Sequence, residues 1–169
     1  MLKRTCWVIM GVSGCGKSSF GQAFAQALPL PYAEGDDDHS AENIIKMAAG
    51  TALTDADRHH WLRLLQERIA EAKENGRGLV LSCSALKRAY RDLLRQADTD
   101  LRFIHLHGDP KVIAARMQVR QHHFMPPTLL VSQLATLEPL ADDEAGMTLD
   151  ISQPMQQLVE LALDYARHE

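Results

Sequence analysis

The residues with the clearest chemistry lie in the segment 11–18, whose sequence is GVSGCGKS. It matches the pattern G-x-x-x-x-G-K-[S/T] in full, between a strand-like and a helical segment, as that motif requires. Lys17 is expected to neutralise the β- and γ-phosphates of a nucleotide, and the Ser18 hydroxyl to bind Mg²⁺. The alternative is a glycine-rich turn that binds nothing. Backbone N–H groups can turn inward onto phosphate oxygens in the rest of the segment, at Gly11, Val12, Ser13, Gly14, Cys15 and Gly16.

A second candidate site is the acidic segment 34–38, which contains Glu34, Asp36, Asp37 and Asp38. It follows a short strand-like segment, and ligands of open α/β sheets bind beyond the carboxyl ends of the strands. One of these carboxylates, placed against a hydroxyl, could take its proton while Mg²⁺ neutralises the phosphates. The alternative is a solvated acidic turn that caps the next helix.

The apolar segment 78–83 helps to distinguish between the classes of enzyme that use such a loop. It ends without the acidic residue with which many proteins of this loop type support Mg²⁺. The acidic segment 34–38 is the nearest replacement. This pattern disfavours a GTPase or a motor ATPase and favours a small kinase.

A possible lid lies at residues 116–135. Arg116 and Arg120 are one helical turn apart, and they precede His122, His123 and a Pro-rich break. A cationic helix with such a break suits a lid that closes over phosphates and excludes water. The alternative is a solvated basic helix face, and the two histidines are typical surface residues.

The elements that must position these residues alternate along the chain, which predicts one α/β domain over residues 1–169 with a parallel sheet wrapped by helices. Strands are predicted at 5–10, 32–34, 78–83, 101–107 and 147–151. Helices are predicted at 17–28, 41–50, 54–76, 85–97, 110–123, 126–138 and 155–167. Thr54 and Asp57 form a capping box for the longest of them.

Composition excludes several classes of function. The formal net charge is −4 and the basic residues are scattered, so we expect no nucleic-acid partner. The spacing of Cys6, Cys15 and Cys83 fits neither a disulfide framework nor a zinc site. No apolar run approaches the roughly 18 residues of a membrane span, and residues 1–10 lack a signal-peptide pattern. We therefore expect a cytoplasmic protein with no membrane partner.

Several segments together resemble the gluconate kinases. The longer ones are LTDADR at 53–58, CSALKRAYRDLLR at 83–95 and HFMPPTLLVSQLATLE at 123–138. Single residues of the likeness are Gly35, Asp36, His39, Asn43, Lys46, Met47, Gly50, Trp61 and Leu62. The likeness runs in order from about residue 7 to about residue 153. The segments after the glycine-rich loop are much more specific than the loop itself, which thousands of unrelated proteins share.

The resemblance implies a three-layer α/β/α P-loop kinase fold akin to shikimate kinase, with a five-stranded parallel sheet in the order 2-3-1-4-5 and a helical lid. It implies a gluconokinase that uses ATP and Mg²⁺ to phosphorylate D-gluconate at the 6-hydroxyl. The product, 6-phospho-D-gluconate, would enter sugar-acid catabolism. Members of this family are commonly homodimers.

The resemblance also implies roles for individual residues. Asp36 is the expected general base for the 6-hydroxyl, and Glu34 would hold Mg²⁺ through water. Arg58 is the candidate for the substrate carboxylate, to which a guanidinium offers a bidentate match. For Arg58 the alternative is an ion pair on the helix surface with Asp55 or Asp57.

Four further residues complete the implied site. His39 and Lys87 would bond sugar hydroxyls, with helix capping and solvated charge as the alternatives. Arg116 and Arg120 would clamp phosphate or adenine from the lid.

The chain departs from the family pattern at a few positions. Ser40 and His60 stand where Pro is usual, His122 stands where Gly is usual, and Cys15 replaces Ser. None of these changes removes a group that phosphoryl transfer requires.

Two other functions stay open. A shikimate or other sugar-acid kinase would share Asp36 and the arginine clamp but should lack the segment 83–95. A nucleotide-binding module that senses a sugar acid without converting it is the second, although the intact Lys17, Ser18 and Asp36 argue against it.

Overall fold

A five-stranded parallel sheet forms the centre of the molecule in a computed structural model, which describes residues 4–119 and 128–169. The strand order is β2-β3-β1-β4-β5, which confirms the predicted order 2-3-1-4-5. The central strands are buried on both faces, as the continuous apolar runs of parallel sheets require. The strands are β1 (Cys6–Met10), β2 (Tyr32–Glu34), β3 (Leu79–Ser82), β4 (Arg102–His107) and β5 (Gly146–Asp150).

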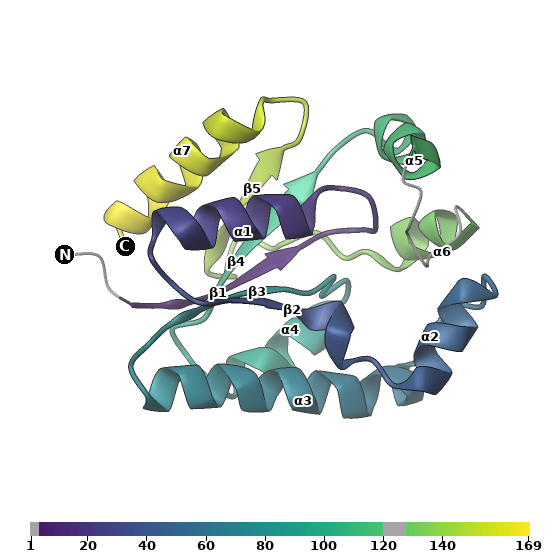
Figure 1. Cartoon of the computed structure of the whole chain (residues 1–169), viewed down its shortest axis with the longest axis horizontal. Coiled ribbons are helices and arrows are strands. Elements are labelled where there is room, and N and C mark those ends of the chain that lie inside the picture. Colours follow the sequence, from purple (N-terminus) through teal and green to yellow (C-terminus); the bar gives the residue numbers. More distant parts are fainter. Residues whose placement is uncertain (1–3, 120–127) are drawn as a thin grey trace.

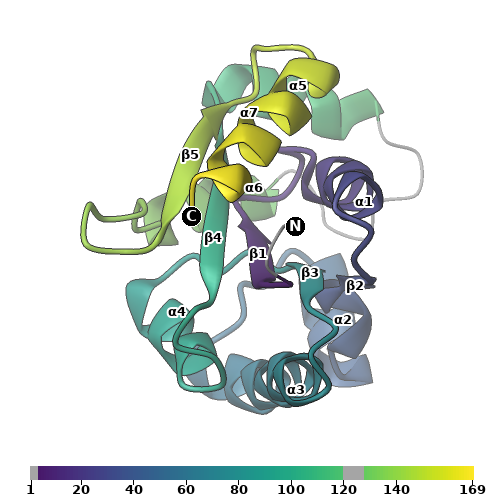
Figure 2. The ribbon, with the colours of Figure 1, turned by 90° about the vertical axis from the view of Figure 1, so that its left-hand side faces the viewer.

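Helices cover both faces of the sheet and complete three layers (Figures 1 and 2). On one face lie α1 (Lys17–Ala27) and α7 (Met155–Arg167), which enclose a core around Trp7, Phe20 and Phe24. On the other face lie α3 (Asp55–Glu74) and α4 (Arg88–Arg95), whose core contains Trp61, Leu65 and Phe103. Side chains from successive positions of β1 enter the two cores alternately, as the pleat of a strand dictates.

The remaining helices gather at the carboxyl ends of the strands, at the right-hand end of Figure 1. They are the 3₁₀ turn η1 (Gly35–Asp38) and the helices α2 (Ala41–Ala48), α5 (Pro110–Val119) and α6 (Thr128–Thr136). The chain leaves β1 towards β2 on one side of the sheet, whereas β4 lies on the other side. Such a switch point is where ligands bind in open α/β sheets.

The start of α4 and the cap of α2 differ from the sequence prediction. The helix predicted at 85–97 begins only at Arg88, because Ala85 has a φ of +46° and Lys87 is extended, with φ −103° and ψ 144°. The prediction for Arg120, His122 and the middle of the lid falls outside the described residues. Ser40 supplies the cap of α2, since its Oγ accepts the Asn43 N–H at 3.1 Å, so none of the preceding acidic residues serves as that cap.

A fully buried ion pair fixes the segment between β3 and α4. The side chains of Arg91 and Glu144 are 0% and 1% exposed, and two bonds of 2.7 and 2.9 Å join them. Arg91 also donates to the Ala85 carbonyl at 2.8 Å, and Arg95 reaches Glu144 at 2.6 Å. The pair thereby ties the distinctive segment 83–95 to the loop before β5.

Among the helices of the described ranges, none is both long and apolar enough to cross a membrane.

Candidate active site

The glycine-rich loop joins β1 to α1 and has the backbone shape that a phosphate cradle needs. Gly14 has a φ of +83°, and a Cβ there would lie 2.5 Å from the Cγ of Met117 on α5. A larger residue at Gly14 would therefore be both strained and obstructed. Gly16 is the left-handed residue before α1, which directs the helix N-terminus towards the loop. The local geometry agrees with the predicted anion site.

Lys17 and Ser18 are the first two residues of α1, and their side chains bond different groups. The Lys17 ammonium donates to the carbonyls of Gly11 and Val12, at 3.0 Å each, so it lies folded over the loop. The Ser18 hydroxyl donates to the Glu34 carboxylate. A hydroxyl and a carboxylate side by side form the kind of oxygen donor pair that Mg²⁺ accepts together with phosphate oxygens and waters.

Tyr32 holds Glu34 in that position. Its hydroxyl donates to Glu34 Oε2 at 2.8 Å and lies 2.7 Å from the Oγ of Ser82 on β3. Burial raises the pKa of Tyr32 to about 12, with the hydrogen bond to Glu34 acting in the same direction. The phenol therefore stays protonated and remains a donor to the carboxylate.

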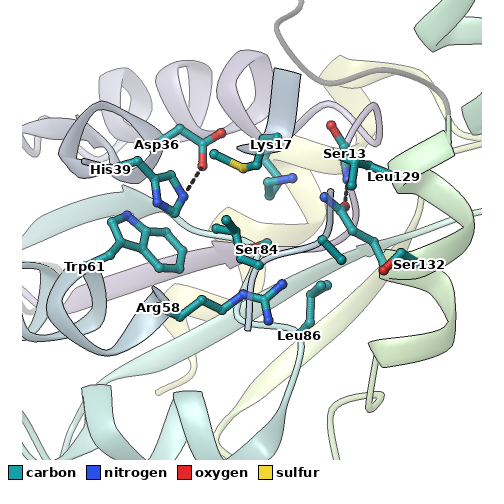
Figure 3. A pocket seen from close by; sticks show the side chains of 14 residues that line it. Ser13, Lys17, Asp36, His39, Arg58, Trp61, Ser84, Leu86, Leu129 and Ser132 are labelled. Atoms are coloured by element: carbon teal, nitrogen blue, oxygen red, sulfur yellow. Dashed lines mark hydrogen bonds and ion pairs between the residues drawn. The ribbon is translucent and has the colours of Figure 1, made fainter. Parts of the chain in front are cut away.

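The acidic turn η1 is fixed against the end of β3. A Cβ at Gly35 would lie 2.3 Å from the Ser82 carbonyl, so only glycine fits this close approach. The Trp61 indole, from α3, donates to the Gly35 carbonyl at 2.7 Å. Its ring also stacks on His39, with centroids 4.1 Å apart. These contacts place Asp36 at the carboxyl edge of the sheet, where its Oδ1 lies 3.7 Å from His39 Nε2 (Figure 3).

Arg58 lies on the first turn of α3 and lines the same pocket. Its guanidinium donates to the Tyr90 hydroxyl at 3.1 Å, and that hydroxyl donates in turn to Asp55. Asp57 is engaged by Lys46 at 2.9 Å and by the cap of α3 at Thr54. The geometry thus places Arg58 in the pocket, while the two nearby aspartates serve other partners.

Lys87 is placed differently from Arg58. Its ammonium bonds Asp55 at 3.1 Å and lies 5.6 Å above the centre of the Tyr90 ring. It is not among the pocket's lining residues in the described chain. Contact between Lys87 and a substrate therefore stays a prediction.

The first pocket brings together residues from widely separated parts of the chain. In Figure 3, Asp36, Lys17 and Arg58 surround one space between the glycine-rich loop and α3. The open volume inside it is about 30 Å³, because α2 and α6 close over it. Its lining consists of Ser13, Lys17, Asp36, His39, Met47, Ala52, Leu53, Arg58, Trp61, Ser84, Leu86, Leu129, Ser132 and Gln133.

A second pocket of about 550 Å³ lies on the other side of the loop, a size within the usual range for ligand sites. It is bounded by Gly14 and Gly16, by Arg116 from α5 and by the residues between β5 and α7. Arg116 is exposed and donates to the Ile151 carbonyl at 3.3 Å. Arg116 therefore lines a pocket next to the glycine-rich loop, and its contact with phosphate or adenine stays a prediction, whereas Arg120 lies outside the described residues.

Two contacts of the site could not be found from the motifs alone. The side chain of Gln133 on α6 accepts the backbone N–H of Ser13 at 2.7 Å, so this helix contacts the phosphate cradle directly. The carbonyl of Ser84 accepts the Gly11 N–H at 3.2 Å, which ties the segment after β3 to the same loop. Both segments lie within the stretches that resemble gluconate kinases. That resemblance is the one feature of the sequence that marks them as parts of the site.

The arrangement has the parts for transfer of a phosphoryl group to a hydroxyl. The loop and Lys17 can hold phosphates, and Asp36 can take a proton in a pocket that opens onto the same lysine. Arg58 adds a planar cation suited to a carboxylate in the acceptor.

Comparisons with known proteins agree with this geometry. The family model for shikimate kinase matches residues 13–155. A gluconokinase of Gluconobacter oxydans is 47% identical, with 85% of this chain and 80% of that protein covered. The thermoresistant gluconokinase of Escherichia coli is 42% identical, with 90% and 88% covered. The crystal structure of a gluconokinase from Sinorhizobium meliloti superposes with a TM-score of 0.89 at 44% identity, with 99% and 94% covered.

Proposed function

Since the chain belongs to the gluconokinases, within the shikimate kinase family, we propose that its two pockets hold D-gluconate and ATP on either side of the glycine-rich loop. The reaction is transfer of the γ-phosphoryl group of ATP to D-gluconate, which yields 6-phospho-D-gluconate. The residue roles proposed below rest on one observation, which is that Asp36, Lys17 and Arg58 line the same pocket.

In this proposal Asp36 acts as the general base. Its carboxylate accepts the proton of the 6-hydroxyl as that oxygen forms its bond to the γ-phosphorus and the bond to the β-phosphate oxygen breaks. Lys17 leaves the Gly11 and Val12 carbonyls and follows the charge on the transferred group. The N–H groups of the loop and the N-terminus of α1 stabilise the phosphate oxygens.

Mg²⁺ fits the oxygen pair formed by Ser18 and Glu34. We propose that Ser18 binds the ion directly and that Glu34 holds it through water, with Tyr32 fixing the carboxylate. When bound, Mg²⁺ neutralises charge on the phosphates. Within the described residues no group of three or more His, Cys, Asp or Glu side chains could hold a metal by itself, which suits an ion that keeps phosphate and water ligands.

Arg58 is proposed to bind the carboxylate of gluconate, and Lys87 is a proposed contact to a sugar hydroxyl. The resemblance implies a sugar hydroxyl for His39 as well, but both of its ring nitrogens face protein groups, Asn43 Nδ2 and Asp36 Oδ1, which favours the positioning role proposed below. Residues of α2 and α6 line the first pocket, and we propose that these helices move outward as gluconate enters. Closure afterwards would exclude water from the phosphates. The adenosine is assigned to the second pocket, where Arg116 would clamp it or the phosphates. The same role for Arg120 rests on the resemblance alone, because Arg120 lies outside the described residues.

We further propose that residues 1–169 act as one kinase domain with a lid near 116–135, in a cytoplasmic homodimer. The resemblance to the gluconate kinases supports the domain, the lid and the dimer, and the cysteine spacing and the lack of a signal-peptide pattern support the cytoplasm. Sedimentation of the purified protein would test the dimer directly.

The position of phosphorylation provides the test of the reaction as written. ³¹P NMR of the product of ATP and gluconate should show phosphorus coupled to two protons, because carbon 6 is a CH₂ group. Coupling to a single proton would place the phosphate on a secondary hydroxyl, and a signal of inorganic phosphate alone would mean hydrolysis. Either result would contradict the proposal.

Replacing Glu34 by Gln should raise the Mg²⁺ concentration for half-maximal activity by about tenfold or more, as loss of an outer-shell carboxylate usually does. The carboxylate charge is lost while the side chain keeps its shape. Mg²⁺ titrations of the initial rate at saturating substrates measure the effect. Glu42→Gln, on the exposed side of α2, is the matched control. Equal Mg²⁺ requirements in the two variants would rule out the assigned role.

Replacing Arg58 by Lys should raise the KM for gluconate by roughly tenfold or more, since a bidentate bond to a charged group is lost. The KM for ATP should change little, because the second pocket lies across the loop. Steady-state kinetics with each substrate varied in turn measure both values. Arg63→Lys, exposed on the same helix, controls for the loss of an arginine. A rise confined to the KM for ATP would refute the assignment.

A further inference from the structure

Asn43 connects the acidic turn to the N-terminus of α3. Its side chain is almost fully buried, and its amide nitrogen Nδ2 donates to the Asp57 carbonyl at 2.9 Å. The same nitrogen lies 3.4 Å from Nδ1 of His39. Asp57 is itself fixed by Lys46 and by the capping box of α3. Asn43 therefore has little freedom to turn its amide.

This arrangement determines which nitrogen of His39 carries the proton. The Asp57 carbonyl can only accept, so the group facing it must be the NH₂ of Asn43. The same NH₂ lies 3.4 Å from Nδ1 of His39 and can only donate, so Nδ1 is the acceptor in a hydrogen bond between them. In a neutral imidazole the proton consequently resides on Nε2, and Nε2 is the atom that faces Asp36 Oδ1 at 3.7 Å.

The ring is also held in neutral form and in one plane. Burial, and then the positive charge of Arg58, lower the pKa of His39 to about 4, although Asp38 acts in the opposite direction. The stack on Trp61 fixes the ring plane, with 18° between the two rings. Charged groups facing the Asp36–His39 pair come from η1 itself (Asp38), from α3 (Arg58) and from the start of α1 (Lys17).

We propose that His39 is a positioning residue for Asp36, kept by Asn43 in the tautomer that donates from Nε2 to the carboxylate. The proposal rests on the assignment of Asp36 as the base and adds what directs it. A donor at Oδ1 fixes the direction in which the Asp36 carboxylate faces the pocket that it shares with Lys17 and Arg58. The distance of 3.7 Å shortens to a hydrogen bond in the substrate complex, as catalytic contacts often do.

The tautomer can be measured without any turnover. Long-range ¹H–¹⁵N spectra of the full chain, labelled at its 8 histidines, distinguish a protonated Nε2 from a protonated Nδ1. The His39→Gln variant identifies the His39 signals by their loss. We expect Nε2–H at pH 7 in the wild-type protein. A His39 signal of the Nδ1–H form, or of the doubly protonated ring, would overturn the proposal.

Kinetics then separate positioning from packing. His39→Gln keeps a side-chain N–H donor and should retain more kcat than His39→Leu, which we expect to lose about tenfold or more, the usual worth of a hydrogen bond to a charged group. The loss in His39→Leu should fall on kcat rather than on the KM for ATP, because the acidic turn is separate from the glycine-rich loop and α1. Equal kcat values in the two variants would refute the positioning role.

Asn43→Asp tests whether Asn43 determines the tautomer of His39. A carboxylate at this position accepts from Nδ1, so the imidazole either switches its proton to Nδ1 or becomes doubly protonated. Either change appears in the spectrum and should lower kcat, whereas Asn75→Asp at the end of α3 should change neither. An unchanged His39 spectrum in folded Asn43→Asp would contradict the assignment. If the wild-type enzyme failed to phosphorylate gluconate, the proposed function would fail while the tautomer measurement still stood.

Discussion

Replacing Asp36 by Asn lowers kcat for gluconate phosphorylation by about 10³-fold, within the usual range for loss of a general base, while ATP still binds. The amide has nearly the same shape but cannot take the proton of the 6-hydroxyl at neutral pH. The phosphate cradle belongs to β1 and α1 and contains no part of the acidic turn. A coupled assay measures kcat, and calorimetry with a non-hydrolysable ATP analogue measures nucleotide binding.

The neighbouring Asp37 offers a matched control for this experiment. It lies on the same 3₁₀ turn and is exposed to solvent, so Asp37→Asn removes an equal charge from almost the same place. We expect this variant to keep most of its activity. Near-wild-type turnover in Asp36→Asn, or an equal loss in both variants, would show that Asp36 is not the base.

Replacing Arg91 by Leu lowers the free energy of unfolding by about 3 kcal/mol, the lower end of the usual cost of breaking a buried ion pair, because Arg95 still pairs with Glu144. Glu144 loses its two bonds from Arg91, and the Ala85 carbonyl loses its donor. Urea unfolding at neutral pH, followed by circular dichroism, measures the change. Because Ala85 precedes the pocket residue Leu86, the variant should also bind gluconate more weakly.

The ion pair of Arg88 with Asp143 provides the comparison. It joins the same helix to the same loop, but both side chains are largely exposed. Arg88→Leu should therefore change the unfolding free energy far less, because solvent screens such pairs. Similar losses of unfolding free energy in Arg91→Leu and Arg88→Leu would mean that burial does not make the Arg91 ion pair more stabilising than the exposed one.

The pH dependence of stability follows from Glu144. Burial alone would raise its pKa, but hydrogen bonds from Arg91, from the Ala141 N–H and from Arg95 lower the pKa from 4.5 to about 2. Ionised Glu144 therefore stabilises the folded state fully above pH 4.5, its pKa in the unfolded chain. This stabilisation is lost as the pH falls from 4.5 towards 2. Urea unfolding should therefore show a smaller loss of stability over this pH range in Arg91→Leu than in the wild-type protein.

The donor side of the site could be predicted from the sequence because it is local. The motif at 11–18, the strand before it and the helix after it are consecutive in the chain, and the structure places all three as expected. The strand order was predicted from the resemblance to a known family. Periodicity alone indicates a parallel sheet without fixing which strands are neighbours.

The acceptor side depends on contacts between distant residues, which spacing alone does not determine. Asp55 and Asp57 lie three residues and one residue before Arg58, and this closeness in sequence is the basis for predicting an ion pair as the alternative. In the structure Asp57 binds Lys46 and Thr54, while Tyr90, thirty-two residues away, accepts from Arg58. The contact of Gln133 with the Ser13 N–H spans 120 residues and arises only when α6 folds over the loop.

The central claim is that the phosphoryl group passes from ATP to gluconate rather than to water or another acid. The initial rate of ADP formation, measured with gluconate, idonate, shikimate, gluconolactone and water as acceptors, tests it most directly. The account predicts a rate with gluconate well above those with shikimate and with water alone. A rate with gluconate no higher than the rate with water would contradict it.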